Sequence, residues 1–161
     1  MRHRFLAPVG LALFLAACGQ PHDSGAPAPT FAIEESATPE EQSSFPPVDP
    51  ALLAAPNSTF TAIEPSEVGV IGAEQVLHAI EPLTSAEFGE SGNVEVTVRN
   101  EGANAIADVV RGDLPDDAIG SAHVRVEFIP SPEGWFPANA YRRWQCRRAA
   151  DPSAWSATPC P

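Results

Sequence analysis

The feature that most constrains the fold is an alternation of apolar and polar residues in the second half of the chain. Over residues 122–128, apolar residues at every second position alternate with His123, Arg125 and Glu127. Residues 94–99 show the same period. Because successive side chains of a strand point to opposite faces of a sheet, this pattern predicts two half-buried strands. The chain is therefore expected to build a sheet with one apolar face.

Turn-forming residues place further strands beside these two. Residues 90–93 and 100–104 are rich in Gly and Asn, which favour turns. Residues 105–110 are therefore expected to return as a strand, and residues 135–146 form a final extended region. Short strands joined by short turns are typical of an antiparallel meander.

One short helix is expected to pack on this meander. Residues 73–81 place three apolar side chains on one helical face, and Pro82 should end the helix. Residues 68–71 are compatible with a short strand. The fold class predicted for residues 61–161 is therefore α+β, a small antiparallel β-meander with one short helix in a single globular domain.

A segment poor in packing residues precedes this domain. Residues 19–60 contain eight prolines and six acidic residues but no Lys or Arg. Such a segment buries too little apolar surface to offset the entropy lost on ordering, and proline favours extended chain. We therefore predict that residues 18–60 are a disordered tether that acts as a spacer. The alternatives are a docking strip at residues 45–48 or a short helix at residues 51–55.

The first 17 residues have the pattern of an export signal. A short start with Arg2 and Arg4 is followed by an apolar run at residues 5–17. This run is too short to cross a membrane as a helix, which needs about 20 residues. Residues 1–17 are therefore predicted to be a signal peptide.

The apolar run ends in a short motif of small residues and a cysteine, Leu15-Ala16-Ala17-Cys18, followed by Gly19. This motif resembles the lipobox of bacterial lipoproteins, in which small residues fit the peptidase and the cysteine receives the lipid. The resemblance implies that Cys18 becomes the acylated N-terminal residue and anchors the chain in a lipid bilayer, since several acyl chains hold a protein stably. Gly19 implies the outer membrane, facing the periplasm, because an Asp at that position would retain the protein in the inner membrane.

The charge of the chain excludes some classes of function. The sequence has 9 Arg and no Lys against 21 acidic residues, which gives a formal net charge of −12. Nucleic-acid binding needs a surplus of cations that displaces counterions, so no nucleic-acid partner is expected. The absence of Lys also excludes a lysine nucleophile and a P-loop lysine.

Two further cysteines lie near the C-terminus. An even pair in an exported chain favours a disulfide between Cys146 and Cys160, which encloses 13 residues and holds a proline-rich end in place. The alternatives are a redox pair and a zinc site. The spacing is not C-x-x-C, and two cysteines without a nearby His pair leave zinc short of ligands, so neither a metal nor another cofactor is expected.

The segment around the first of these cysteines concentrates positive charge and aromatic rings. If residues 140–148 form a strand, Trp144 and Cys146 share one face and pack in the core. The alternative is a ligand surface, because Arg binds carboxylates and phosphates in bidentate fashion. A third interpretation is that these arginines pair with the protein's own acids. The candidate ligand-binding residues are Arg142, Arg143, Trp144, Arg147, Arg148 and Trp155.

The sequence contains no catalytic motif. The acid–base candidates are His78, which has Glu74 and Glu81 at helical spacing, and His123, which alternates onto the polar face of its strand. The C-terminal arrangement of two Trp and two Cys resembles that of small bacterial secreted proteins, and this resemblance implies no function. The predicted function is a membrane-anchored, non-enzymatic binding or accessory module for an envelope protein or a cell-wall partner such as peptidoglycan. The alternative is a small lipid-anchored hydrolase or metal-dependent enzyme that uses His78 or His123 with nearby carboxylates.

Overall fold

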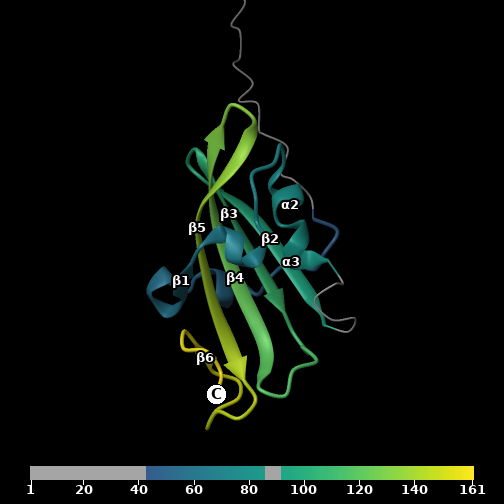
Figure 1. Ribbon diagram of the computed structural model, residues 1–161, viewed down its shortest axis with the longest axis vertical. Helices are drawn as coiled ribbons and strands as arrows, with labels where there is room; N and C mark the ends of the chain where they lie inside the picture. The colour runs from purple at the N-terminus through teal and green to yellow at the C-terminus, as the bar shows by residue number, and fades with distance from the viewer. Residues whose placement is uncertain (1–42, 86–91) are drawn as a thin grey trace, which may run out of the picture. The chain divides into compact units, whose positions relative to one another are not determined.

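The computed structural model describes residues 43–85 and 92–161, whose main element is an antiparallel sheet of six strands (Figure 1). The strand order is β1-β5-β4-β3-β2, and β6 also pairs with β5. The four long strands β2 to β5 follow one another as a meander, as predicted, and the predicted turn at residues 100–104 joins two of them. The predicted turn at residues 90–93 lies partly outside the described residues. The strands are β1 (Thr61–Ile63), β2 (Val94–Glu101), β3 (Asn104–Arg111), β4 (Ile119–Ser131), β5 (Gly134–Cys146) and β6 (Trp155–Ser156).

Two single-turn helices pack on the sheet, where the sequence predicts one helix over residues 73–81 that Pro82 ends. They are α2 (Val76–Ala79) and α3 (Glu81–Thr84). The prediction about Pro82 is wrong because this residue lies in the first turn of α3, where its missing N–H has no helical partner to lose. Neither these helices nor any other in the described residues is long and apolar enough to cross a membrane.

The short strand that is predicted at residues 68–71 does not form, because a 3-10 helix ends at Val68 and the chain then turns at Gly69. This helix, η2 (Pro65–Val68), begins with a capping box in which the Glu67 side chain accepts from the Glu64 N–H at 3.0 Å. It ends at Gly69, whose left-handed conformation (φ 73°) favours glycine. The apolar residues around Gly69 therefore reach the core from a helical turn and not from a sheet edge.

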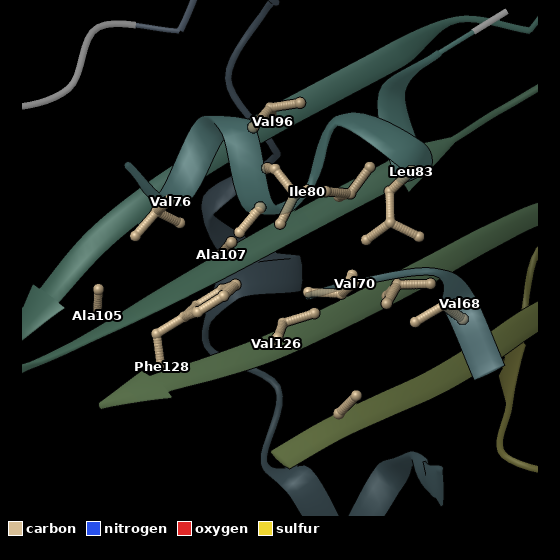
Figure 2. Packing of buried hydrophobic residues seen from close by; sticks show 14 residues of the cluster. Val68, Val70, Val76, Ile80, Leu83, Val96, Ala105, Ala107, Val126 and Phe128 are labelled. Carbon is tan, nitrogen blue, oxygen red and sulfur yellow. The ribbon is translucent and has the colours of Figure 1, made fainter. Parts of the chain in front are cut away.

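The apolar core lies between the sheet and the helices α2, α3 and η2 (Figure 2). In β4, the side chains of Val124, Val126 and Phe128 point into it and are at most 7% exposed. Their neighbours on β3, Val109 opposite Val124 and Ala107 opposite Val126, belong to the same cluster. The alternation predicted for this strand is thus confirmed.

Residues 43–60, which we call the strap, begin beside the apolar core, where Phe45 packs, and then cover the second face of the sheet. The strap contains α1 (Pro50–Leu53) and the 3-10 helix η1 (Asn57–Thr59), and it leads directly into β1. Its side chains Val48 and Phe60 are only 2% and 7% exposed. The sheet is therefore buried on both faces.

The strap differs from the prediction of a disordered tether that extends to residue 60. Proline lacks an N–H but keeps its carbonyl, and the Val96 N–H at the sheet edge donates to the Pro46 carbonyl oxygen at 2.8 Å. An extended, proline-rich segment can thus pack beside an edge strand where it carries a few apolar anchors. Residues 1–42, which include the predicted signal peptide and the predicted lipidation site Cys18, lie outside the described residues.

A disulfide closes the C-terminal end of the chain. Cys146 and Cys160 are joined, as predicted, with their Cα atoms 5.3 Å apart. The closed loop lays β6 against β5, with Trp155 opposite Gln145. Trp155 is thereby placed on the same face of the sheet as the strap.

Candidate functional site

A buried network of charged side chains lies under the strap. Asp108, on β3, accepts hydrogen bonds from His123 Nε2 and from Arg125 Nε, each at 2.8 Å, and both donors lie on the neighbouring strand β4. Arg99, on β2, donates to the second carboxylate oxygen. Asp108 and His123 are 0% exposed, and Arg125 and Arg143 are also buried. One carboxylate is thus shared by several donors; we call this set the Asp108 network.

Arg143 fixes the position of the proton on His123. The Nε and Nη2 atoms of Arg143 lie 3.1 Å and 2.9 Å from His123 Nδ1. Because a guanidinium can only donate, Nδ1 must accept, and the proton of the neutral ring must sit on Nε2, which donates it to Asp108. A second proton on Nδ1 would face the donors of Arg143.

The pKa values of both titratable groups in the network lie below their ordinary values. Burial lowers the pKa of His123, because the protonated ring would lose its hydration, although the hydrogen bond to Asp108 opposes this effect. The charges of Arg143 and Arg125 lower the pKa of His123 further. Burial raises the pKa of Asp108, but the hydrogen bond from His123 and the charge of Arg125 outweigh it. At neutral pH the network therefore holds a carboxylate beside a neutral imidazole.

The arginines of the network also hold the strap. Arg125 donates to the Ala55 carbonyl at 2.6 Å and to the Leu53 carbonyl at 2.9 Å. Arg143 donates to the Leu52 carbonyl at 3.4 Å. These carbonyls lie at or just beyond the C-terminal end of α1, where few backbone acceptors have helical partners, although the Leu52 carbonyl also accepts from the Ala55 N–H at 3.3 Å. The strap therefore docks by presenting the carbonyls of this turn to buried cations.

Two aromatic rings complete the enclosure of His123. The rings of Phe60 and Trp155 pack edge-on against the imidazole, with centroids 5.0 Å and 5.7 Å away. Phe60 also lies under the Arg143 guanidinium, at 4.4 Å from Cζ to the ring centre. Because His123 and Asp108 have no exposed surface, a substrate cannot contact either of them in this conformation. The Asp108 network, through Arg125 and Arg143, secures the strap to β4 and β5.

The second acid–base candidate, His78, lies in a different place. It is exposed on α2, on the opposite side of the sheet from His123. Over residues 43–85 and 92–161, no group of three or more His, Cys, Asp or Glu side chains is placed to hold a metal ion. The structure therefore does not bring the two histidines together.

An open pocket lies on the apolar face of the sheet, beside α3 and η2, with a volume of about 400 Å³. Its floor carries Arg142 and Trp144 from β5 and Arg111 from the end of β3. The loop between β3 and β4 forms its opposite wall. The lining also includes Glu67, Val68, Leu83, Leu114, Asp116 and Val124.

Arg142 brings an unused donor to this pocket. Its Cζ atom lies 4.9 Å from the centre of the Trp144 ring, so the guanidinium stacks on an aromatic face. Its Nε atom is buried and has no hydrogen-bond partner within the described chain. Arg111 adds a second cation, and burial lowers the pKa of its guanidinium. The floor of the pocket is thus both cationic and aromatic.

The two acids at the rim of the pocket are engaged by backbone groups. Glu67 accepts from the Glu64 N–H in the capping box of η2. Asp116 accepts from the N–H groups of Ala118 and Ile119 at 2.7 Å and 2.8 Å, and these bonds lower the pKa of Asp116. In the described part of the chain, neither acid forms an ion pair with an arginine of the floor.

The six residues predicted as a ligand surface are divided between the two faces of the sheet. Arg142 and Trp144 line the pocket, whereas Arg143 and Trp155 enclose His123. The division follows from the strand itself, because alternate residues of β5 point to opposite faces. The sequence predicts this alternation but not what covers each face.

The last two arginines of the predicted surface lie beyond β5. Arg147 donates to the carbonyls of Leu114 and Asp116, at 2.8 Å and 2.9 Å, and so braces the loop between β3 and β4. Arg148 pairs with Asp117 at the surface. Of the six candidates, only Arg142 and Trp144 line the pocket.

Four charged residues of the network and the pocket floor were not among the candidate site residues that the sequence predicts: Arg99, Asp108, Arg111 and Arg125. A signal for Asp108 exists, since it is the only charged residue within the otherwise apolar run 105–110. A charge in a buried strand must find partners, so its position alone indicates a network. The identity of the partners depends on strand register, which the sequence does not specify.

The fold and the two sites define a small, disulfide-closed sheet protein with a sealed charged network and an open cationic pocket. Comparison with protein-family models, with curated proteins and with solved structures gives no match for this chain.

Proposed function

We propose that this chain is a lipid-anchored, non-enzymatic binding module of the bacterial cell envelope, and that its ligand occupies the pocket beside α3. The observation that supports the proposal is the separation of the two sites. The His123–Asp108 pair is sealed under the strap, whereas the open pocket presents Arg142, Arg111 and apolar side chains. A concave, largely apolar pocket with a few polar groups is the usual form of a small-ligand site.

The composition of the pocket favours binding over catalysis. Its described lining contains no Ser, Thr, Cys or His that could act as a nucleophile or a proton carrier. Its two carboxylates, Glu67 and Asp116, accept hydrogen bonds from backbone N–H groups. The side chains that the pocket offers a ligand are the Arg142 guanidinium, an aromatic ring and aliphatic groups, which bind without reacting.

The proposed lipid anchor gives this module its location. The lipobox-like motif that ends in Cys18, followed by Gly19, supports attachment to the outer membrane on its periplasmic side. Residues 19–42 would then separate the strap from the bilayer. A module placed there meets envelope proteins and peptidoglycan, which are the partner classes that the sequence predicts.

Site-directed photo-crosslinking in the protein's own cells tests the binding site. A photoreactive amino acid at Leu114, in the pocket lining, is compared with one at Glu133, an exposed position on the β4–β5 hairpin. We expect the membrane-bound chain to capture one envelope component from position 114 and none from position 133. Equal capture from both positions, or no capture from position 114, would refute the pocket as the binding site.

The substitution Cys18→Ser tests the anchor in the same cells. We expect the unmodified chain to incorporate labelled palmitate and to fractionate with the outer membrane, and Cys18→Ser to lose both properties. A Cys18→Ser chain that still carries the label would refute acylation at Cys18. Fractionation of the unmodified chain with the inner membrane would refute the proposed location.

A further inference from the structure

We infer that the pocket binds a ligand with a single carboxylate attached to an apolar chain, and that Arg142 binds the carboxylate. The inference rests on the proposed binding function and specifies the chemistry of the ligand. It follows from three features of the pocket: an unused donor, a limited positive charge and an apolar wall.

The unused donor is the Nε atom of Arg142. This atom is buried without a hydrogen-bond partner within the described chain, a state that native proteins seldom leave unresolved. Nε and an Nη atom of one guanidinium form a planar fork that matches the two oxygens of a carboxylate. Trp144 covers one face of the guanidinium, with 4.9 Å from Cζ to the ring centre, and the partly exposed Arg142 side chain lines the pocket. Because Nε itself has no exposed surface, a carboxylate that bridges Nε and an Nη atom requires a small rotation of the side chain.

The charges around the pocket favour a ligand with one negative charge. Arg142 and Arg111 line the floor, and Arg142 supplies the donor for an anion. Glu67 and Asp116 stand at the rim, and the backbone hydrogen bonds that lower the pKa of Asp116 keep it ionised. A ligand with several negative charges would approach these acids, whereas a monocarboxylate places its only charge at the arginines.

The walls of the pocket favour an apolar chain behind the carboxylate. Val68, Leu83, Leu114 and Val124 line it together with the Trp144 ring. Its volume of about 400 Å³ lies within the usual range for small-ligand sites, about 300–1,000 Å³. A small anion without a chain would leave this apolar surface in contact with water. A fatty acid and the apolar C-terminus of a peptide share the required chemistry.

Isothermal titration calorimetry of the full-length Cys18→Ser chain, purified without detergent, tests the ligand class. The probes are decanoate, decanol, acetate, and acetyl-Leu-Leu as its free acid and as its amide. We expect decanoate to bind about tenfold or more tightly than decanol, because only decanoate pairs with the guanidinium. Acetate should bind far more weakly than decanoate, because it lacks the chain. If the source is a peptide C-terminus, acetyl-Leu-Leu should bind more tightly than decanoate and lose its affinity as the amide.

A matched pair of variants tests the role of Arg142. Arg142→Gln and Arg148→Gln remove the same charge from neighbouring positions, but Arg148 is exposed and lies outside the pocket. We expect Arg142→Gln to weaken decanoate binding about tenfold and to leave decanol binding unchanged, and Arg148→Gln to change neither. Unchanged decanol binding and an unchanged melting temperature show that the pocket is intact. Arg142→Lys keeps the charge but loses the fork, so its affinity for decanoate should lie between those of Arg142→Gln and Arg148→Gln.

Several results would overturn the inference. They are equal affinity for decanoate and decanol, an affinity of Arg142→Gln equal to that of Arg148→Gln, and binding of neither decanoate nor acetyl-Leu-Leu. If Arg142→Gln does not fold, unchanged carboxylate preference in Arg142→Lys refutes the proposed fork. Site-specific crosslinking from Leu114 without any carboxylate binding would refute the ligand class and leave the proposed function standing. If neither crosslinking from Leu114 nor carboxylate binding is observed, the proposed function and this inference are both refuted.

Discussion

On one face of the sheet, apolar side chains meet α2, α3 and η2, whereas on the other face charged side chains meet the strap. The two faces are equally buried at their centres, since Val126 on the first and Asp108 on the second are both 0% exposed. A single strand serves both, because Asp108 and Val109 are neighbours on β3 and point in opposite directions. The two faces differ in the kind of contact that holds their covering segments in place.

Apolar packing and charged packing make different demands on the covering segment. An apolar face requires a filled volume and accepts several combinations of side chains. A charged face requires an acceptor for every buried donor. Arg125 and Arg143 can therefore be covered only by a strap whose carbonyls lie where these arginines donate. We therefore expect the apolar face to supply the bulk of the stability, and the Asp108 network to determine where the strap docks.

Removal of the buried acid Asp108 should have the largest effect. Asp108→Asn leaves the buried Arg125 and the partly exposed Arg99 without a counter-charge, so we expect the free energy of unfolding to fall by about 3–5 kcal/mol. Urea denaturation measures the loss, and hydrogen exchange at the Val48 amide shows whether the strap is released first. The control is Asp117→Asn, which removes an exposed acid. A loss no greater than that of the control would contradict the role given to the network.

A cavity on the apolar face should cost slightly less and should leave the strap in place. Ile80 is 0% exposed between the helices and the sheet, so Ile80→Ala should lower the free energy of unfolding by about 2–5 kcal/mol. Because no charge is involved, the loss should be the same at low and high salt. Exchange at the Val48 amide should stay slow until the whole domain unfolds. Early release of the strap in Ile80→Ala would show that the two faces are not independent.

Acidification should weaken the charged face before the apolar one. The pKa of His123 lies below its ordinary value of 6.5 in the folded protein, so the unfolded chain takes up the proton first and stability falls as the pH drops below about 6.5. The lowered pKa of Asp108 adds a further loss in more acidic solution, below its ordinary value of 3.8.

The variant His123→Gln isolates this effect. Its amide N–H can donate to Asp108 and its carbonyl can accept from Arg143, so it reproduces both hydrogen bonds without titrating. We expect the unfolding free energy of His123→Gln to be nearly flat between about pH 7 and about pH 5, where that of the unmodified chain falls. His78→Gln serves as the exposed control. Equal pH slopes for the unmodified chain and His123→Gln would contradict the prediction.

An exposed ion pair should matter least. The side chains of Arg148 and Asp117 are 59% and 82% exposed, so Arg148→Ala should change the free energy of unfolding by less than about 0.5 kcal/mol. Thermal denaturation at two salt concentrations is sufficient to measure it. A loss comparable with that of Asp108→Asn would mean that burial does not distinguish the two groups of charges.

The local pattern of the sequence predicts the strands well but not what covers them. The period of two over residues 122–128 reports which side chains share a face, and β4 follows it. The same pattern places His123 on a polar face, which suggests contact with water. The imidazole is instead fully buried, because the strap comes from a distant part of the chain. Alternation indicates the faces of a strand and says nothing of whether a face is covered.

The strap and the pocket depend on contacts that are remote in sequence. The strap contains four prolines and few large apolar residues, so its composition does not single out Val48 and Phe60, whose contacts include residues far along the chain. In the pocket, Arg142 and Trp144 are within the predicted cluster, whereas Arg111 joins them only through the pairing of β3 with β4 and of β4 with β5. The disulfide could be predicted because it follows from counting cysteines in an exported chain.

The way in which the strap is held has a consequence for the order of events during synthesis. Arg125 and Arg143 reach its carbonyls across 70 to 91 residues of chain, so the strap emerges from the ribosome long before its partners exist. Contacts of such separation form late, because the intervening chain must first be ordered. We therefore expect the segment made first among the described residues to be among the last to dock. A chain exported in an unfolded state would carry it, still undocked, until β5 had followed.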